Sequence, residues 1–134
     1  MATTTATITV SSKDLVSDEL ALTTTSTLTQ AGNSTGLTGT GGLGRKKLAS
    51  GHAQYTLFDG DDYTADKAHK IYLKNTSTTA SEYFAIDINS ERMGKLYAGD
   101  WAFFPWDANA STNDIKIDPS AADMVLEYML FTDE

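Results

Sequence analysis

Few side chains in this sequence have the types and spacing that catalysis requires. The two histidines, His52 and His69, are far apart, and neither belongs to a His-Glu-x-x-His or Gly-x-Ser-x-Gly motif. The absence of cysteine excludes a thiol nucleophile, a disulfide framework and a thiolate metal site. We expect His69, which begins an alternating segment, to have a structural role. We therefore predict no catalytic residue and no enzyme. A small hydrolase that uses two of the many carboxylates is the one enzymatic alternative.

The best candidate for a metal site is the acidic turn Asp59-Gly60-Asp61-Asp62, with Asp66 nearby. Calcium prefers several carboxylate and carbonyl oxygens on a tight turn. The spacing does not match the twelve-residue calcium loop, however, and Asp-Gly is also an ordinary turn between two strands. The glycine-rich run 39–44 lacks the Gly-Lys-Ser/Thr ending of a phosphate-binding loop. We therefore predict no metal and no cofactor, and calcium binding at the acidic turn stays open as an alternative.

The charge of the chain argues against nucleic-acid and membrane partners. The formal net charge is -8, and residues 51–134 hold six basic and fifteen acidic side chains. This part of the chain would repel both polyanions and anionic lipid surfaces. No apolar stretch approaches the roughly 20 residues of a membrane-spanning helix. The first residues also lack the basic and apolar regions of a signal peptide, so we expect synthesis in the cytoplasm without export.

An aromatic cluster is better suited to contact with another macromolecule. Trp101, Phe103, Phe104 and Trp106 place four rings within six residues. Side chains of a strand alternate between its two faces, so one pair of rings can enter a core while the other pair needs a cover. The cover is a loop, a neighbouring subunit or a stacked sugar. All four residues are candidates for partner contact.

A basic triplet is the second contact candidate. Arg45-Lys46-Lys47 follows the glycine-rich run and stands out in an otherwise acidic protein. Such a triplet can dock an acidic partner, although a short basic run is commonly just solvated. Both interpretations stay open at this point.

Strands must position these side chains, because an alternation of period two dominates from residue 54 onward. The alternation occurs in six segments, which are 55–57, 69–74, 83–88, 101–106, 115–117 and 124–131. Turn signals such as Asp59-Gly60 and Asn89-Ser90 separate them. The pattern predicts an all-β fold, an antiparallel β-sandwich or a jelly-roll-like barrel, and it leaves the strand order open. We expect Thr132-Asp133-Glu134 to be a frayed end.

The first fifty residues differ in composition from the rest. Thirteen of the first forty residues are Thr, and six glycines lie between residues 31 and 44. Threonine favours an extended backbone, whereas clustered glycine opposes a packed strand or helix. Ile8-Thr9-Val10 and Leu20-Ala21-Leu22 indicate short strands. We predict an extended N-terminal arm over residues 1–50, either flexible or ordered against a neighbouring subunit, and a β-sandwich body over residues 51–134.

A resemblance covers the segment 70–131. Its parts, in order, are Ile71-Tyr72-Leu73-Lys74-Asn75-Thr76, then Gly94-Lys95-Leu96-Tyr97-Ala98-Gly99-Asp100 leading into Phe103-Phe104-Pro105, then Asp114-Ile115-Lys116-Ile117, and finally Leu126-Glu127-Tyr128-Met129-Leu130-Phe131. This order resembles the small virion structural proteins of tailed bacteriophages. It includes no catalytic signature, and residues 1–50 match no motif of that kind. The resemblance implies a β-sandwich that sits on a capsid or a tail.

The resemblance also implies a function and a set of partners. It suggests a non-enzymatic capsid decoration (cement) protein on the virion surface, which binds across subunits of the major capsid protein and stabilises the shell. It further suggests a homo-oligomer, and a trimer is common among such proteins. A tail or neck component is the first alternative, and a carbohydrate-binding module that uses the aromatic cluster is the second. Location in the particle, oligomeric state and order of the arm by itself stay open.

Overall fold

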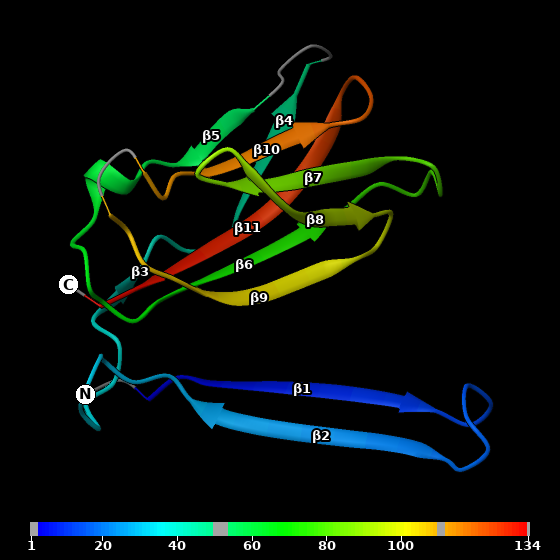
Figure 1. Ribbon diagram of the computed structural model, residues 1–134, viewed down its shortest axis with the longest axis horizontal. Helices are drawn as coiled ribbons and strands as arrows, with labels where there is room; N and C mark the ends of the chain where they lie inside the picture. The colour runs from blue at the N-terminus through cyan, green and yellow to red at the C-terminus, as the bar shows by residue number, and fades with distance from the viewer. Residues whose placement is uncertain (1–2, 50–53, 110–111, 134) are drawn as a thin grey trace.

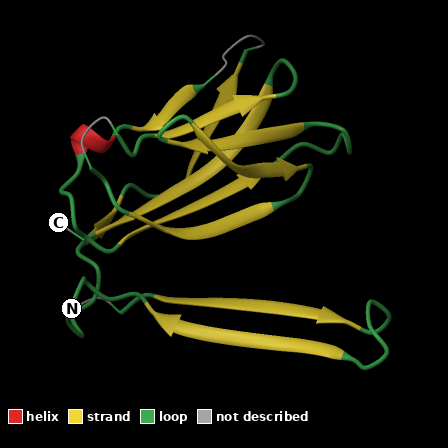
Figure 2. Cartoon of the chain, in the orientation of Figure 1, coloured by secondary structure: helices red, strands yellow, loops and turns green. Residues whose placement is uncertain are grey.

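The computed structural model describes residues 3–49, 54–109 and 112–133, and the statements below concern these residues. Two antiparallel β-sheets pack face to face, and a separate two-stranded hairpin extends beside them (Figure 1 and Figure 2). The predicted all-β, antiparallel sandwich is confirmed. The helix that the described part contains is a single 3-10 turn, η1 (Gly60–Asp62). No helix in these ranges has the length and apolar character needed to cross a bilayer.

The two sheets of the sandwich share nine strands. The first sheet contains, in spatial order, β5 (Tyr55–Phe58), β10 (Ile115–Pro119), β7 (Tyr83–Ile88) and β8 (Glu91–Tyr97). The second contains β3 (Gly39–Thr40), β4 (Gly44–Leu48), β11 (Met124–Thr132), β6 (His69–Asn75) and β9 (Trp101–Trp106). Strand β11 lies inside the second sheet, because it pairs with β6 along one edge and with both β3 and β4 along the other. The C-terminal strand therefore connects β3 and β4 to the rest of the second sheet.

The core lies between the sheets and follows the alternation read from the sequence. Every second residue of β6 is buried, beginning with His69 and Ile71, while the residues between them are partly exposed. Apolar side chains of both sheets form one cluster, which includes Ile71, Leu73, Phe84, Ile86, Ile115, Ile117, Leu126 and Leu130. Burial of this apolar surface is the main force that holds the sheets together.

Three strands of the sandwich, β3, β4 and β8, were not predicted. Strand β8 pairs only with β7 and forms an edge, and its first three residues are exposed. Strand β4 also forms an edge, and its residues Arg45 and Lys47 are exposed. Edge strands with charged exposed residues carry a weak alternation signal. Because β3 and β4 pair with β11, residues 39–48 belong to the sandwich rather than to an arm that ends at residue 50.

The hairpin consists of β1 (Thr5–Ser12) and β2 (Leu20–Thr27), which pair with each other along their full length. One face of the hairpin is apolar and presents Ala6, Ile8, Val10, Leu20 and Leu22, and the other is lined mainly by threonine. Among the described residues, neither strand pairs with the sandwich. An isolated two-stranded hairpin is at best marginally stable in water, so this one needs a further surface to pack against.

Gly44 shows how tightly β4 lies on β11. A Cβ atom on Gly44 would lie 2.8 Å from Cζ of the Tyr128 ring, whereas one on Gly41 would meet nothing within 4 Å. We expect Gly44→Ala to lower the free energy of unfolding by about 1–3 kcal/mol, because the ring must move. Gly41→Ala is the matched control and should change it by less than about 0.5 kcal/mol. Urea unfolding of both variants checks this, and equal stabilities would contradict it.

Candidate interaction surface

The outer face of the second sheet carries an aromatic cluster. In β9 the side chains of Trp101 and Phe103 point away from the core, and pairing with β6 brings them beside Lys74 and Tyr72. The Phe103 ring meets the ring of Phe131 edge-on, with centroids 6.1 Å apart. Trp101 is 49% exposed, a large fraction for a tryptophan. We refer to Tyr72, Trp101, Phe103 and Phe131 together as the aromatic face.

A charged row lies next to the aromatic face. Arg45 of β4 forms an ion pair of 3.0 Å with Glu127 of β11, and the Tyr72 hydroxyl donates a hydrogen bond of 3.0 Å to the same carboxylate. Hydrogen bonds from Arg45 and then from Tyr72 lower the pKa of Glu127. Burial, followed by the neighbouring Glu127, raises the pKa of Tyr72. Glu127 therefore stays ionised and holds the Tyr72 ring in a fixed orientation on the face.

The three bases of the triplet contact different neighbours in the structure. Arg45 pairs with Glu127, and the Lys47 ammonium lies 3.5 Å from Asp123 on the exposed surface. Lys46 is partly buried, and its ammonium lies over the Tyr55 ring at 5.1 Å from the centroid. Because each base already has an acidic or aromatic neighbour in its own chain, the three do not form one free patch.

Two of the four aromatic candidates face the core. Trp106 is only 3% exposed, its Nε1 donates to the carbonyl of Asn113 at 2.8 Å, and its ring lies against Phe58 and Tyr63. Phe104 packs against the same core cluster. The prediction that Phe104 and Trp106 contact a partner is therefore corrected, because the alternation of β9 turns both inward. Trp101 and Phe103 are the pair on the outer face.

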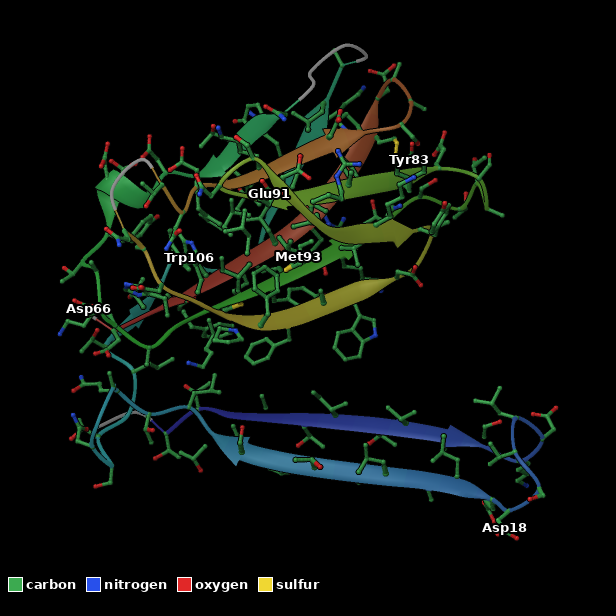
Figure 3. All side chains as sticks on the ribbon, in the orientation of Figure 1. Asp18, Asp66, Tyr83, Glu91, Met93 and Trp106 are labelled. Atoms are coloured by element: carbon green, nitrogen blue, oxygen red, sulfur yellow. The ribbon has the colours of Figure 1, made fainter. Side chains whose placement is uncertain are left out.

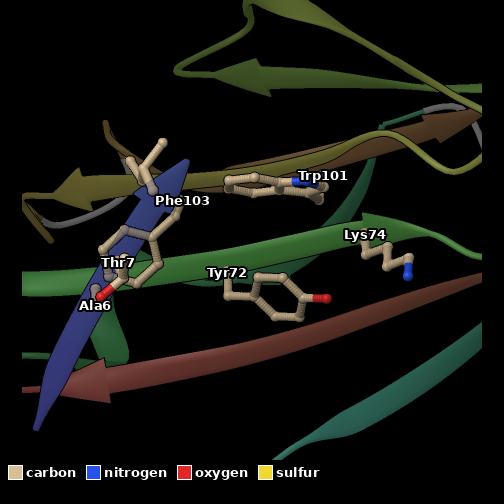
Figure 4. A pocket seen from close by; sticks show the side chains of 7 residues that line it. Ala6, Thr7, Tyr72, Lys74, Trp101 and Phe103 are labelled. Carbon is tan, nitrogen blue, oxygen red and sulfur yellow. The ribbon is translucent and has the colours of Figure 1, made fainter. Parts of the chain in front are cut away.

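A groove separates the hairpin from the aromatic face. It has a volume of about 340 Å³ and is lined by Ala6, Thr7 and Ile8 of β1 and by Tyr72, Lys74, Trp101 and Phe103 of the sandwich (Figure 4). Most of this lining is apolar. The apolar side chains of the hairpin are incompletely covered, because Ile8, Val10 and Leu22 are between 38% and 51% exposed. The hairpin thus stands beside the face without packing closely on it.

Sequence reasoning missed this pairing of surfaces. The alternation in 69–74 puts Tyr72 and Lys74 on the other side of the strand from Ile71 and Leu73, and the structure buries the latter pair. No local signal, however, tells which outer face of the sandwich a hairpin earlier in the chain will approach. The groove depends on the link between β2 and β3, whose Ala31 amide donates to the Asp133 carboxylate at 2.9 Å. That contact spans 102 positions of the chain.

The groups with catalytic or metal-binding potential have structural partners. His69 is buried; its Nδ1 accepts a hydrogen bond from the amide of Asp133 at 3.2 Å, so its Nε2 donates to the carbonyl of Thr64 at 2.9 Å. Asp59 caps η1 by accepting from the amide of Asp61 at 2.9 Å. In the described ranges no three His, Asp or Glu side chains gather as metal ligands. His52 lies outside the described residues.

No family model, no curated protein and no solved structure matches the chain.

Proposed function

We propose that this chain is a non-enzymatic structural protein of a virion, a capsid decoration protein that holds neighbouring subunits of the shell together. The observation that carries the proposal is the groove between the hairpin and the aromatic face, two apolar surfaces of one chain that lie opposite each other without closing. Such a pair can receive an apolar edge or loop of a neighbouring subunit. Exposed apolar side chains that lie together on a surface commonly mark contacts between proteins.

A cement protein stabilises a shell by burying contact area between subunits and needs no catalytic chemistry. Each copy adds contact area across a boundary between shell subunits, and repetition over many equivalent sites multiplies the effect. The hairpin gains from such a contact, because a neighbour would cover its half-exposed Ile8 and Val10. The strong negative charge of the chain favours a protein partner over nucleic acid or an anionic membrane.

A double variant of the aromatic face tests the proposal. We expect Trp101→Ala with Phe103→Ala to weaken binding to capsids stripped of the protein by about 100-fold, because aromatic anchors dominate such interfaces. The matched control is Met93→Ala, which removes an exposed apolar side chain from β8 in the other sheet and should change affinity less than about threefold. Both variants are assayed by sedimentation with capsids and by the melting temperature of the shell.

The outcome separates the proposal from its alternatives. Unchanged capsid binding by the double variant, or no rise in shell stability with the wild-type protein, would contradict cementing through this groove. Binding to purified tails or necks in place of capsids would move the protein to that part of the particle. Trp101 also presents a ring on which a sugar could stack. A glycan array on which the wild-type protein binds and the Trp101→Ala variant does not would favour a carbohydrate-binding module.

A further inference from the structure

Basic side chains gather on the outer face of the second sheet, although the chain as a whole has a net charge of -8. Among the described strands of this sheet, β4 and β6 hold five bases, whereas Glu127 of β11 is the single acid. The register places four of the bases on the same face as Glu127, and these are Arg45, Lys47, Lys70 and Lys74. The face that borders the groove is therefore locally basic in an acidic protein.

Many of the acidic side chains lie in turns at the two ends of the molecule. The turn 13–19 between β1 and β2 holds three acids, and the segment 59–66 around η1 holds four. Asp18 and Asp66, one from each group, lie toward opposite ends of the longest axis (Figure 3). At an ionic strength of about 0.15 M, charges further away than about 8 Å are largely screened. The nearby bases therefore dominate the potential that a ligand meets at the middle of the face.

Strand pairing places an apolar row between two of these lysines. Along β6, the outer positions hold Lys70, Tyr72 and Lys74 in turn, and neighbours of this kind are about 6.7 Å apart on a strand. Pairing with β11 brings Met129 beside Tyr72, and pairing with β9 brings Phe103 to its other side. The row Met129–Tyr72–Phe103 thus crosses the sheet with one lysine on each side of it.

Both lysines keep hydrogen-bonding capacity for a partner. Lys74 lines the groove (Figure 4), and it forms no ion pair with any residue that the structure describes. The Lys70 ammonium donates to the carbonyl of Ala68 at 2.8 Å, which uses one of its three donors. Glu127 is engaged by Arg45 and by the Tyr72 hydroxyl, so its charge is largely offset within the face.

We propose that the partner segment received by the groove is extended and carries an apolar side chain between two carboxylates, each two residues away from it. In an extended segment that runs along β6, these three side chains have the same spacing as Lys70, Tyr72 and Lys74. The carboxylates pair with the lysines, and the apolar side chain packs on the rings of Tyr72 and Phe103. The net charge of the chain opposes a polyanion such as nucleic acid, which carries a charge on every repeat. The inference rests on the proposed function for the identity of the partner, a shell subunit, and adds the charge pattern of the bound segment.

Charge reversal at Lys74 tests the pattern on stripped capsids. We expect Lys74→Glu to weaken binding by about tenfold, because it sets a carboxylate against a carboxylate of the partner. Lys95→Glu is the matched control, since it makes the same change in net charge on β8 of the other sheet, and it should cost less than about threefold. Lys74→Gln, which places no new charge beside Glu127, should weaken binding about threefold and keep the circular dichroism spectrum of the wild type. Losses at Lys74 no larger than the loss at Lys95 would overturn the proposal.

Peptide binding separates this inference from the proposed function. The probe is a fluorescent peptide in which glutamate, leucine and glutamate alternate with serine, and its control has glutamine in place of both glutamates. We expect fluorescence anisotropy to show at least about fivefold tighter binding of the glutamate peptide at about 0.1 M salt, a preference that shrinks toward about 0.5 M as the charges are screened. No preference between the peptides, or tighter binding of a single-stranded oligonucleotide, would overturn the inference even if capsids bind. A preference for the glutamate peptide without capsid binding would support the acidic pattern and contradict the proposed function.

Discussion

Replacement of Trp106 by alanine is expected to lower the free energy of unfolding by about 4 kcal/mol. The indole is almost fully buried, it lies against the rings of Phe58, Tyr63 and His69, and its Nε1 donates to the Asn113 carbonyl. Its removal leaves a cavity beside these rings and takes the donor away from the Asn113 carbonyl, just before β10. A loss of this size is a large fraction of the 5–15 kcal/mol that typically stabilises a domain.

Trp101→Ala is the matched control for that prediction. Trp101 has the same side chain on the same strand but points to the outer face, where it is about half exposed. Its replacement should therefore cost less than about 1 kcal/mol of stability. Urea unfolding of the two variants under one set of conditions gives both values. Comparable losses would mean that the two faces of β9 are not divided into core and contact surface.

Replacement of Asp133 by alanine is expected to lower the free energy of unfolding by about 2–3 kcal/mol at neutral pH. The residue is 3% exposed, and its Oδ2 accepts hydrogen bonds from the amides of Ala31 at 2.9 Å and Ala68 at 3.1 Å. Its own amide donates to His69. The carboxylate thus connects three segments, which are the link between β2 and β3, the start of β6 and the end of β11. Its removal leaves the amides of Ala31 and Ala68 without this acceptor.

The pH dependence of stability distinguishes the charge of Asp133 from its hydrogen bonds. Burial alone would raise the pKa of this carboxyl, but the Ala31 and Ala68 amides, with Lys67 and His69, hold it below its usual range. The unfolded chain has a pKa of about 3.9 at this position. The stabilisation is therefore fully present above about pH 4 and is lost as the pH falls through the lower pKa of the folded state.

Asp133→Asn separates the two effects. The asparagine Oδ1 can take the place of the acceptor oxygen and receive both amides, but it does not titrate. This variant should recover most of the stability that Asp133→Ala loses at neutral pH. Its stability should fall less than that of the wild type between about pH 4 and pH 2. Unfolding measured in urea at several pH values checks this, and parallel curves for the wild type and Asp133→Asn would contradict it.

The end of the chain is a case in which local sequence misleads. Thr132-Asp133-Glu134 has the composition of a frayed terminus, yet Asp133 is buried, while Glu134 lies outside the described residues. The contacts that bury Asp133 come from residues 65 and 102 positions earlier in the chain. No feature of the sequence near Asp133 predicts these contacts. The prediction of a frayed end was therefore wrong for this residue.

The alternation of period two determined which side chains of β6, β9 and β11 share a face, and with them the all-β sandwich. That result follows from local geometry, because successive side chains of a strand point to opposite faces wherever the strand lies. The tertiary structure alone decided that residues 39–48 join β11, that Trp106 faces the core while Trp101 faces outward, and that the hairpin lies opposite the aromatic face. These outcomes depend on pairing between distant strands, whose free energy comes from contacts that no short stretch of the chain contains.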